Sequence, residues 1–276
     1  MTGNHRLEGA KQKKTDSTCS SSARHTIRQQ GQALYHTLIQ TSPSHTTARI
    51  KYSHLLRQLG RITEARNLLE TLKPDEIADI PLKASFFEAS GALLLASGQF
   101  NEALTAYQSA IRLSPGYLNP YYGLGRTYLW LKNPQEALNA FARALQCKQQ
   151  ALRDGAFFQA SLFWVWNGEG LAHLLAHNED AAQESFLVAE TLAQRSLKGK
   201  SREYQTWSHL GLARLGQGRY QEAEEAYQRF TAFEQIAHAR GFNQELLFDI
   251  ELVGTHGQIK GWRRIFEHVS NLLMNK

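Results

Sequence analysis

The sequence predicts an all-α protein, built as a right-handed α-solenoid of stacked helix hairpins with degenerate capping helices at its ends. A short residue pattern recurs five times along the chain with constant internal spacing, which indicates a repeat protein. The composition is typical of a globular helical chain, because 42% of the 276 residues are hydrophobic and only 20 are Gly and 6 are Pro. Units that contact only their neighbours stack into a solenoid.

The repeated pattern pairs a small residue with an Ala 12 positions later, and a bulky residue follows that Ala by four. Small residues allow two helix axes to approach closely, and a residue four positions after the Ala lies on the same helical face. The pattern therefore predicts a helix hairpin with fixed internal packing. Its five copies are Ser53, Ala65 and Leu69; Gly91, Ala103 and Tyr107; Gly125, Ala137 and Phe141; Gly170, Ala182 and Phe186; and Gly211, Ala223 and Tyr227.

Gly and Pro positions and the spacing of the units predict where the helices end and how long the second helices are. Gly98 and Gly218 fall where the first helix must end in a turn, and Pro115 follows a second helix as a stop. Successive Ala positions are separated by 38, 34, 45 and 41 residues. The two longest separations predict extended second helices, from Leu145 to Leu162 and from Phe186 to Glu203.

Both ends of the repeat array carry partial copies. Residues 29–43 have the pattern of the second half of a unit. Residues 243–276 form a degenerate sixth copy, with Leu246, Gly257 and Phe266 in register and Trp262 where Ala is expected. We interpret this last copy as a hairpin that covers the open apolar face of the final repeat. Its amphipathic second half leaves attachment to a membrane surface as the alternative.

These positions resemble the signature of the tetratricopeptide repeat family, which combines aromatic, Leu-Gly, Ala and Phe/Tyr positions with a closing Pro. The resemblance implies repeats at about 46–79, 84–117, 118–151, 163–196 and 204–237 within a solenoid of residues 27–276. It also implies a non-enzymatic scaffold or adaptor that binds a protein or peptide in a concave groove. The longer units resemble helical repeats of bacterial sensors and regulators. The alternative is therefore a regulator that binds a small peptide and controls a partner or nucleic acid. The clearest copies contain Tyr121, Leu124, Gly125, Tyr128, Ala137 and Phe141, and Trp207, Leu210, Gly211, Ala223 and Tyr227.

The same resemblance implies which residues point into the groove. Tyr122, Arg126 and Trp130 form a stripe at four-residue spacing, in which the guanidinium is expected to bind a carboxylate and the rings to supply contact area. In the alternative interpretation, Trp130 packs under a neighbouring repeat and Tyr122 is half-buried. His54, Gln205 and Ser208 occupy corresponding positions. The expected partner-binding residues are Arg57, Glu88, Asn119, Tyr122, Arg126, Trp130, Trp164 and Asn167.

One known groove chemistry of the family is not expected here. The carboxylate clamp that holds chaperone tails needs Lys and Asn at defined positions of the first two helices. This chain has Ile50 and His54, and then Glu88 and Ala92, at the comparable places.

The positive charge is concentrated at the N-terminus. The whole chain has a formal charge of +6, and residues 1–28 contribute six basic and two acidic side chains, a net +4. We expect residues 1–26 to be a disordered basic tail, with a tether for nucleic acid, anionic lipid or an acidic protein, or a transit peptide, as alternatives. The nearly neutral repeats are not expected to bind nucleic acid. No apolar run approaches the roughly 20 residues of a membrane span, and the two isolated cysteines favour a cytoplasmic location.

Catalytic and metal-binding patterns are weak. Glu169, His173 and His177 follow one another at four-residue spacing, but eight residues of helix span about 12 Å, which is too long for one ion. The chain contains no HExxH, GxxxxGK[ST] or GxSxG pattern. We therefore expect no enzymatic activity, cofactor or metal.

Overall fold

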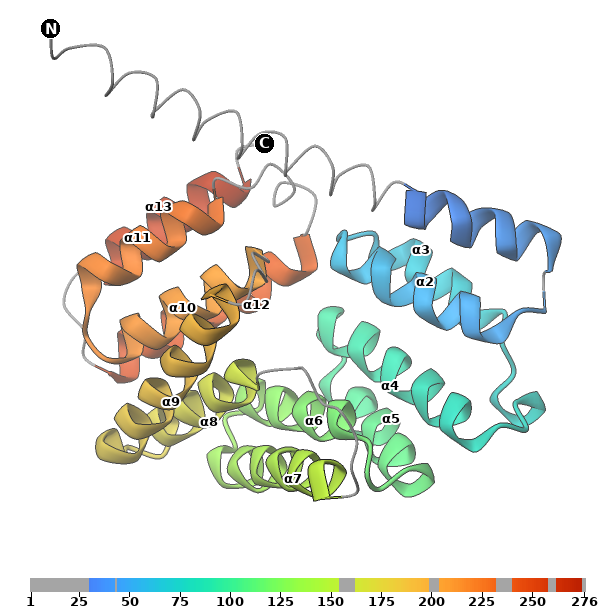
Figure 1. The fold of residues 1–276 in the computed structure, drawn as a ribbon, viewed down its shortest axis with the longest axis horizontal. Coiled ribbons are helices and arrows are strands. Elements are labelled where there is room, and N and C mark those ends of the chain that lie inside the picture. Colours follow the sequence, from blue (N-terminus) through green and yellow to red (C-terminus); the bar gives the residue numbers. More distant parts are fainter. Residues whose placement is uncertain are drawn as a thin grey trace, which may run out of the picture.

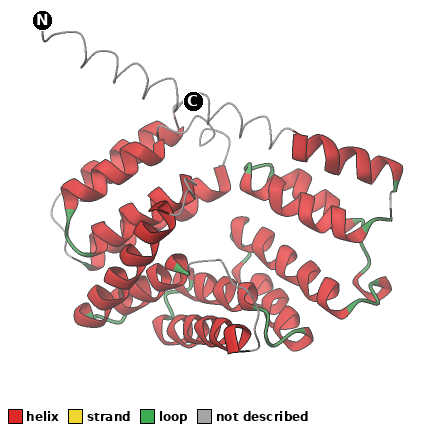
Figure 2. Cartoon of the chain, in the orientation of Figure 1, coloured by secondary structure: helices red, strands yellow, loops and turns green. Residues whose placement is uncertain are grey.

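The computed structural model describes residues 30–42, 44–153, 162–198, 204–231, 240–257 and 262–274, and every regular element in these ranges is helical (Figures 1 and 2). The predicted all-α solenoid is confirmed. The predicted basic tail of residues 1–26 falls outside these ranges. None of the helices within them is long and apolar enough to cross a membrane.

The helices are arranged as consecutive hairpins, each with a first and a second helix. A helix over residues 30–41 precedes them, at the place where the sequence predicts the second half of a unit. A short 3₁₀ helix, η1 (Pro74–Glu76), lies between the first two hairpins. The hairpins are α2 (Thr46–Gln58) and α3 (Ile62–Glu70); α4 (Ile80–Ala96) and α5 (Phe100–Leu113); α6 (Leu118–Trp130) and α7 (Pro134–Arg153); α8 (Phe163–Leu175) and α9 (Glu179–Lys198); α10 (Tyr204–Gly216) and α11 (Tyr220–Thr231); and α12 (Arg240–His256) and α13 (Trp262–Met274).

Both of the second helices that the sequence predicts to be extended are long within the residues that the structure describes. Helices α7 and α9 have 20 residues each, against 14 in α5. Leu162, the predicted end of the first, is instead the N-cap residue of α8. Glu203, the predicted end of the second, falls in a segment that is not described.

The same turn joins the two helices in the first five hairpins. Gly98 and Gly218, predicted at this turn, have φ of 73° and 72°, in the left-handed region that Gly adopts readily. Lys132 and His177 adopt φ of 57° at the equivalent positions. At His177, the backbone N–H donates to the carbonyl of Leu174 (3.0 Å), and the next N–H donates to the carbonyl of His173 (2.9 Å). These are the two bonds of a Schellman motif, which closes the end of a helix.

The bulky residue four positions after the Ala is a wedge between two hairpins. A Cβ atom added to Gly125, in the first helix of the same hairpin, would lie 2.4 Å from the ring of Phe141. One added to Gly168, in the first helix of the next hairpin, would lie 2.5 Å from that ring. The ring is fully buried, so the two glycines leave room for it. The same arrangement places Tyr107 between Gly91 and Gly123, and Phe186 between Gly170 and Gly216.

The solenoid curls until its last hairpin returns toward its first, as Figure 1 shows. Helix α12 packs on α10 and α8 and also contacts α2. Its residues Leu246, Ile250 and Val253 are buried in the core that extends from α6 to α13. Helix α13 buries Ile265 and Val269 against this core, as the predicted capping hairpin requires.

Candidate binding groove

A groove of about 940 Å³ opens on the concave side of the solenoid, between α2, α4 and α6. Trp164 of α8, Tyr107 of α5 and Glu245 of α12 complete its wall. Most of the residues expected from the sequence lie together here. They are Arg57, Glu88, Asn119, Tyr122, Arg126 and Trp164.

One side of the groove is a row of basic and polar residues on α2. Lys51, His54 and Arg57 follow at three-residue spacing and all line the groove. The imidazole Nε2 of His54 lies 3.1 Å from Oε2 of Glu88 on α4, and the hydroxyl of Tyr117 donates to the same oxygen (3.3 Å). Glu88 is therefore held in place by two neighbouring side chains.

A cluster of ion pairs closes the end of the groove that faces α12. Nη1 of Arg126 donates to Oδ1 of Asp249 at 2.6 Å, and both side chains are buried. Glu245 lies 3.9 Å from Nη2 of Arg126 and 3.9 Å from Nη1 of Arg57. Burial raises the pKa of Asp249 to about 6, against the opposing charge of Arg126. Burial also opposes the charge of Arg126, but the two carboxylates and Tyr122 keep its pKa above the ordinary value.

Tyr122 lies beside this cluster and is half-buried, as the alternative interpretation of the stripe anticipated. Its ring packs against Phe141, with centroids 6.0 Å apart. Burial raises its pKa above the ordinary tyrosine value. Tyr122 is therefore a neutral aromatic surface at ordinary pH, with one side anchored on the wedge residue of its own hairpin.

Trp130, the third residue of the predicted stripe, does not line this groove. Its ring stacks on Phe248 of α12 with centroids 3.8 Å apart, and on Phe100 of α5 at 5.6 Å. The ammonium of Lys132 lies 5.1 Å from the centre of the Phe248 ring. The structure thus places Trp130 between hairpins, because α12 folds back over the end of α6.

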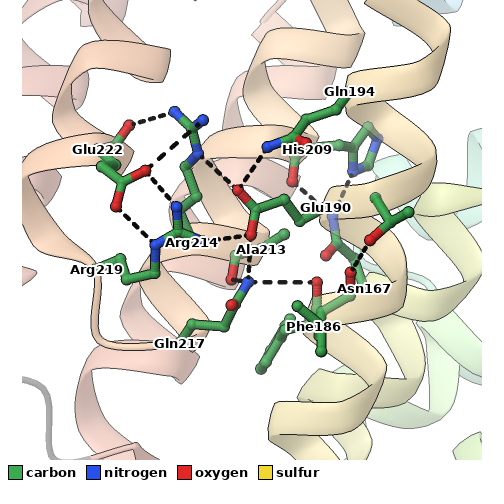
Figure 3. Close-up of polar contacts among 12 residues, drawn as sticks. Asn167, Phe186, Glu190, Gln194, His209, Ala213, Arg214, Gln217, Arg219 and Glu222 are labelled. Carbon is green, nitrogen blue, oxygen red and sulfur yellow. Dashed lines mark hydrogen bonds and ion pairs between the residues drawn. The ribbon is translucent and has the colours of Figure 1, made fainter.

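Asn167 also does not line the groove but joins two hairpins inside the protein (Figure 3). Its amide Nδ2 donates to the backbone carbonyl of His209 (2.9 Å) and lies 3.3 Å from Nδ1 of the same residue. Desolvation and the charge of Arg126 lower the pKa of His209 to about 3. The neutral imidazole then accepts from the amide at Nδ1. Asn167 therefore connects α8 to α10.

A buried carboxylate on α9 is the centre of a second polar network that sequence reasoning missed (Figure 3). Glu190 is only 3% exposed. One carboxylate oxygen accepts from Nε of Arg214 (3.1 Å) and from the amide of Gln194 (3.0 Å). The other accepts from Arg219 and from the amide of Gln217 (3.0 Å). These bonds connect α9 to α10 and to the turn between α10 and α11, so the network fixes the stacking of two hairpins.

Glu169, His173 and His177, the residues of the weak metal pattern, lie in different surroundings. The hydroxyl of Ser185 donates to Oε2 of Glu169 (3.3 Å), and burial raises the pKa of Glu169. Burial lowers the pKa of His173, and His177 lies in the turn after α8. Within the described ranges, no three His, Cys, Asp or Glu side chains are grouped in a way that would hold a metal ion.

The stacked hairpins, their shared turn and the concave groove define a helical repeat protein of the protein-interaction class. Two family models, each described as a tetratricopeptide repeat, match residues 94–156 and 166–235. The chain belongs to the tetratricopeptide repeat family, as the signature residues predicted. Proteins of this family generally act as non-enzymatic interaction scaffolds.

Solved structures of repeat proteins share the fold. A chain in the crystal structure of the APC/C hetero-tetramer Cut9–Hcn1 matches 90% of this chain with 18% identity and a TM-score of 0.58. This chain spans only 44% of that one. BtubC (BKLC) from P. vanneervenii matches 77% of this chain over 90% of its own length, with 17% identity and a TM-score of 0.52. No curated protein sequence matches the chain. At these identities the likeness concerns the fold alone.

Proposed function

We propose that this protein is a non-enzymatic adaptor that captures a peptide or an extended protein segment in the groove between α2, α4 and α6. The observation that carries the proposal is the groove itself, which is concave and is lined by the first helices of three successive hairpins. Grooves that combine aromatic rings with a few polar and charged groups are typical binding sites.

The residues around the groove offer three kinds of contact. Tyr122 and Trp164 present aromatic area. Asn119, which is exposed, presents an amide able to donate to and accept from a peptide backbone. Lys51, Arg57 and Glu88 present charges of both signs. This mixture suits a peptide segment better than a uniformly charged polymer such as nucleic acid.

The test begins with selection of peptides that bind the full chain from a random peptide library. The binding constants of the selected peptides are then measured by isothermal titration for two variants. Asn119→Trp places a large ring in the groove without disturbing the core, because Asn119 is exposed. Thr105→Trp, at an exposed position of the second helix α5, is the matched control.

We expect Asn119→Trp to weaken binding at least tenfold and Thr105→Trp to leave it unchanged. Helical circular dichroism of both variants checks that the fold is retained. Equal effects of the two substitutions, or selected peptides that bind Asn119→Trp as tightly as the wild type, would exclude this groove as the binding site.

A further inference from the structure

Two arginines from different hairpins reach the same part of the groove. Arg57 comes from α2 and Arg126 from α6, and both line the groove. The side chain of Arg126 is only 4% exposed, whereas that of Arg57 is 26% exposed. Burial of a guanidinium is unfavourable unless its donors are hydrogen-bonded.

The donors of these arginines are incompletely used. Asp249 accepts one hydrogen bond, from Nη1 of Arg126. The buried atoms Nε and Nη2 of Arg126 and Nε of Arg57 make no hydrogen bond to any residue that the structure describes. Because a guanidinium presents its N–H groups as a fork, such atoms match the two oxygens of a carboxylate.

Glu245 balances the charge of Arg57 and Arg126 but accepts no hydrogen bond from either guanidinium. Its two oxygens lie 3.9 Å from Nη1 of Arg57 and from Nη2 of Arg126, beyond the range of a hydrogen bond. Helix α12 is held by its buried residues Leu246 and Ile250, so its backbone is not free to bring this side chain closer. The Glu245 side chain is 22% exposed and lines the groove wall, so a ligand in the groove can reach it.

We propose that Arg57 and Arg126 form a carboxylate-binding site, and that an Asp or Glu side chain of a bound peptide replaces Glu245 there. The incoming carboxylate accepts from the unused guanidinium donors, while Asp249 keeps its bond to Arg126. Glu245 is then a placeholder that keeps the site neutral when no ligand is bound. This inference rests on the proposed function, because it names the chemical class of segment that the groove selects.

If Glu245 occupies the site when no ligand is bound, removing its charge should strengthen the binding of an acidic peptide. The probe is the capped peptide Ac-AAEYAA-NH₂, titrated into the full chain by isothermal calorimetry. Its neutral counterpart Ac-AAQYAA-NH₂ tests the need for the carboxylate, and Ac-AAQYAA-OH tests a C-terminal carboxylate as its source.

We expect Glu245→Gln to bind the Glu peptide about tenfold more tightly than the wild type, and Arg57→Gln about tenfold more weakly, the size expected for one charge-assisted bond. Glu251→Gln makes the same charge change at an exposed position of α12 and should have no effect. The neutral peptide should bind more weakly than the Glu peptide and respond to neither substitution.

Several outcomes overturn the proposal. These are a Glu245→Gln variant with unchanged or weaker affinity, an equal gain in Glu251→Gln, a free C-terminus preferred over the Glu side chain, or no binding of the Glu peptide to any variant. If library-selected peptides still bind in the groove and are blocked by Asn119→Trp, only the carboxylate site fails. If they do not, the proposed function fails as well.

Discussion

Replacing Gly168 by Ala tests the wedge that joins the third and fourth hairpins. The new Cβ would lie 2.5 Å from the ring of Phe141, where ordinary contact begins at 3.4 Å, so the ring or the helix must move by roughly 1 Å. The ring is fully buried and is confined on its other side by Gly125. Overpacking of this kind costs about 1–3 kcal/mol, against about 1 kcal/mol gained by Ala over Gly in a helix. These two terms leave a net loss of about 0–2 kcal/mol, so we expect the free energy of unfolding in urea, followed by circular dichroism, to fall by about 1 kcal/mol.

Two matched variants separate overpacking from other effects of the substitution. Gly31→Ala also lies in a helix, but its Cβ meets nothing within 4 Å, so it should leave stability unchanged or raise it by up to about 1 kcal/mol. Phe141→Leu should make room for the new Cβ. Adding Gly168→Ala to this variant should therefore lower the free energy of unfolding by less than it does in the wild type. Additive losses in the double variant would refute the wedge, since residues in contact are expected to couple.

Three further predictions concern stability. Gly98→Ala, at a φ of 73°, should lower the free energy of unfolding by about 1 kcal/mol, and His177→Gly, at a φ of 57°, should raise it; changes of the same sign in urea unfolding would contradict this. His209 has a pKa of about 3 in the folded chain against 6.5 in the unfolded chain. Protonation therefore favours the unfolded chain, and the folded state loses stability as the pH falls below 6.5. The wild type should therefore lose about 2 kcal/mol relative to His209→Gln between pH 7.5 and 5, and a constant difference between the two proteins would show that the imidazole is not held neutral. Glu190→Gln should lower the free energy of unfolding by about 2 kcal/mol, because a neutral amide replaces the buried carboxylate that accepts from Arg214 and Arg219; a loss below about 0.5 kcal/mol would show that these charge-assisted bonds contribute little to stability.

The hairpins were predictable because their determining contacts are local. Gly125 and Phe141 belong to one hairpin, and the sequence spacing alone places them on facing helices. The turn at His177 was likewise predictable from its register with Gly98, although His seldom adopts a positive φ. Residues in the first helices of the first three units, such as Arg57 and Asn119, also fell in the groove as the family geometry implied.

The contacts of α12 were not predictable in the same way. The bond between Arg126 and Asp249 joins residues 123 positions apart. It depends on how far the solenoid curls over several hairpins, and small rotations at each interface accumulate into that curvature. For the same reason the sequence did not show that Phe248 would stack on Trp130, or that Glu245 would complete the groove wall.

Photocrosslinking tests most directly whether the concave groove is the binding site. A benzoylphenylalanine is placed at Asn119 in the groove or at Thr105 on α5, each in the full chain, and irradiated with a peptide from the library selection. The groove account predicts a covalent product at Asn119 that excess unlabelled peptide suppresses, and none at Thr105. A product at Thr105 with none at Asn119 would contradict it.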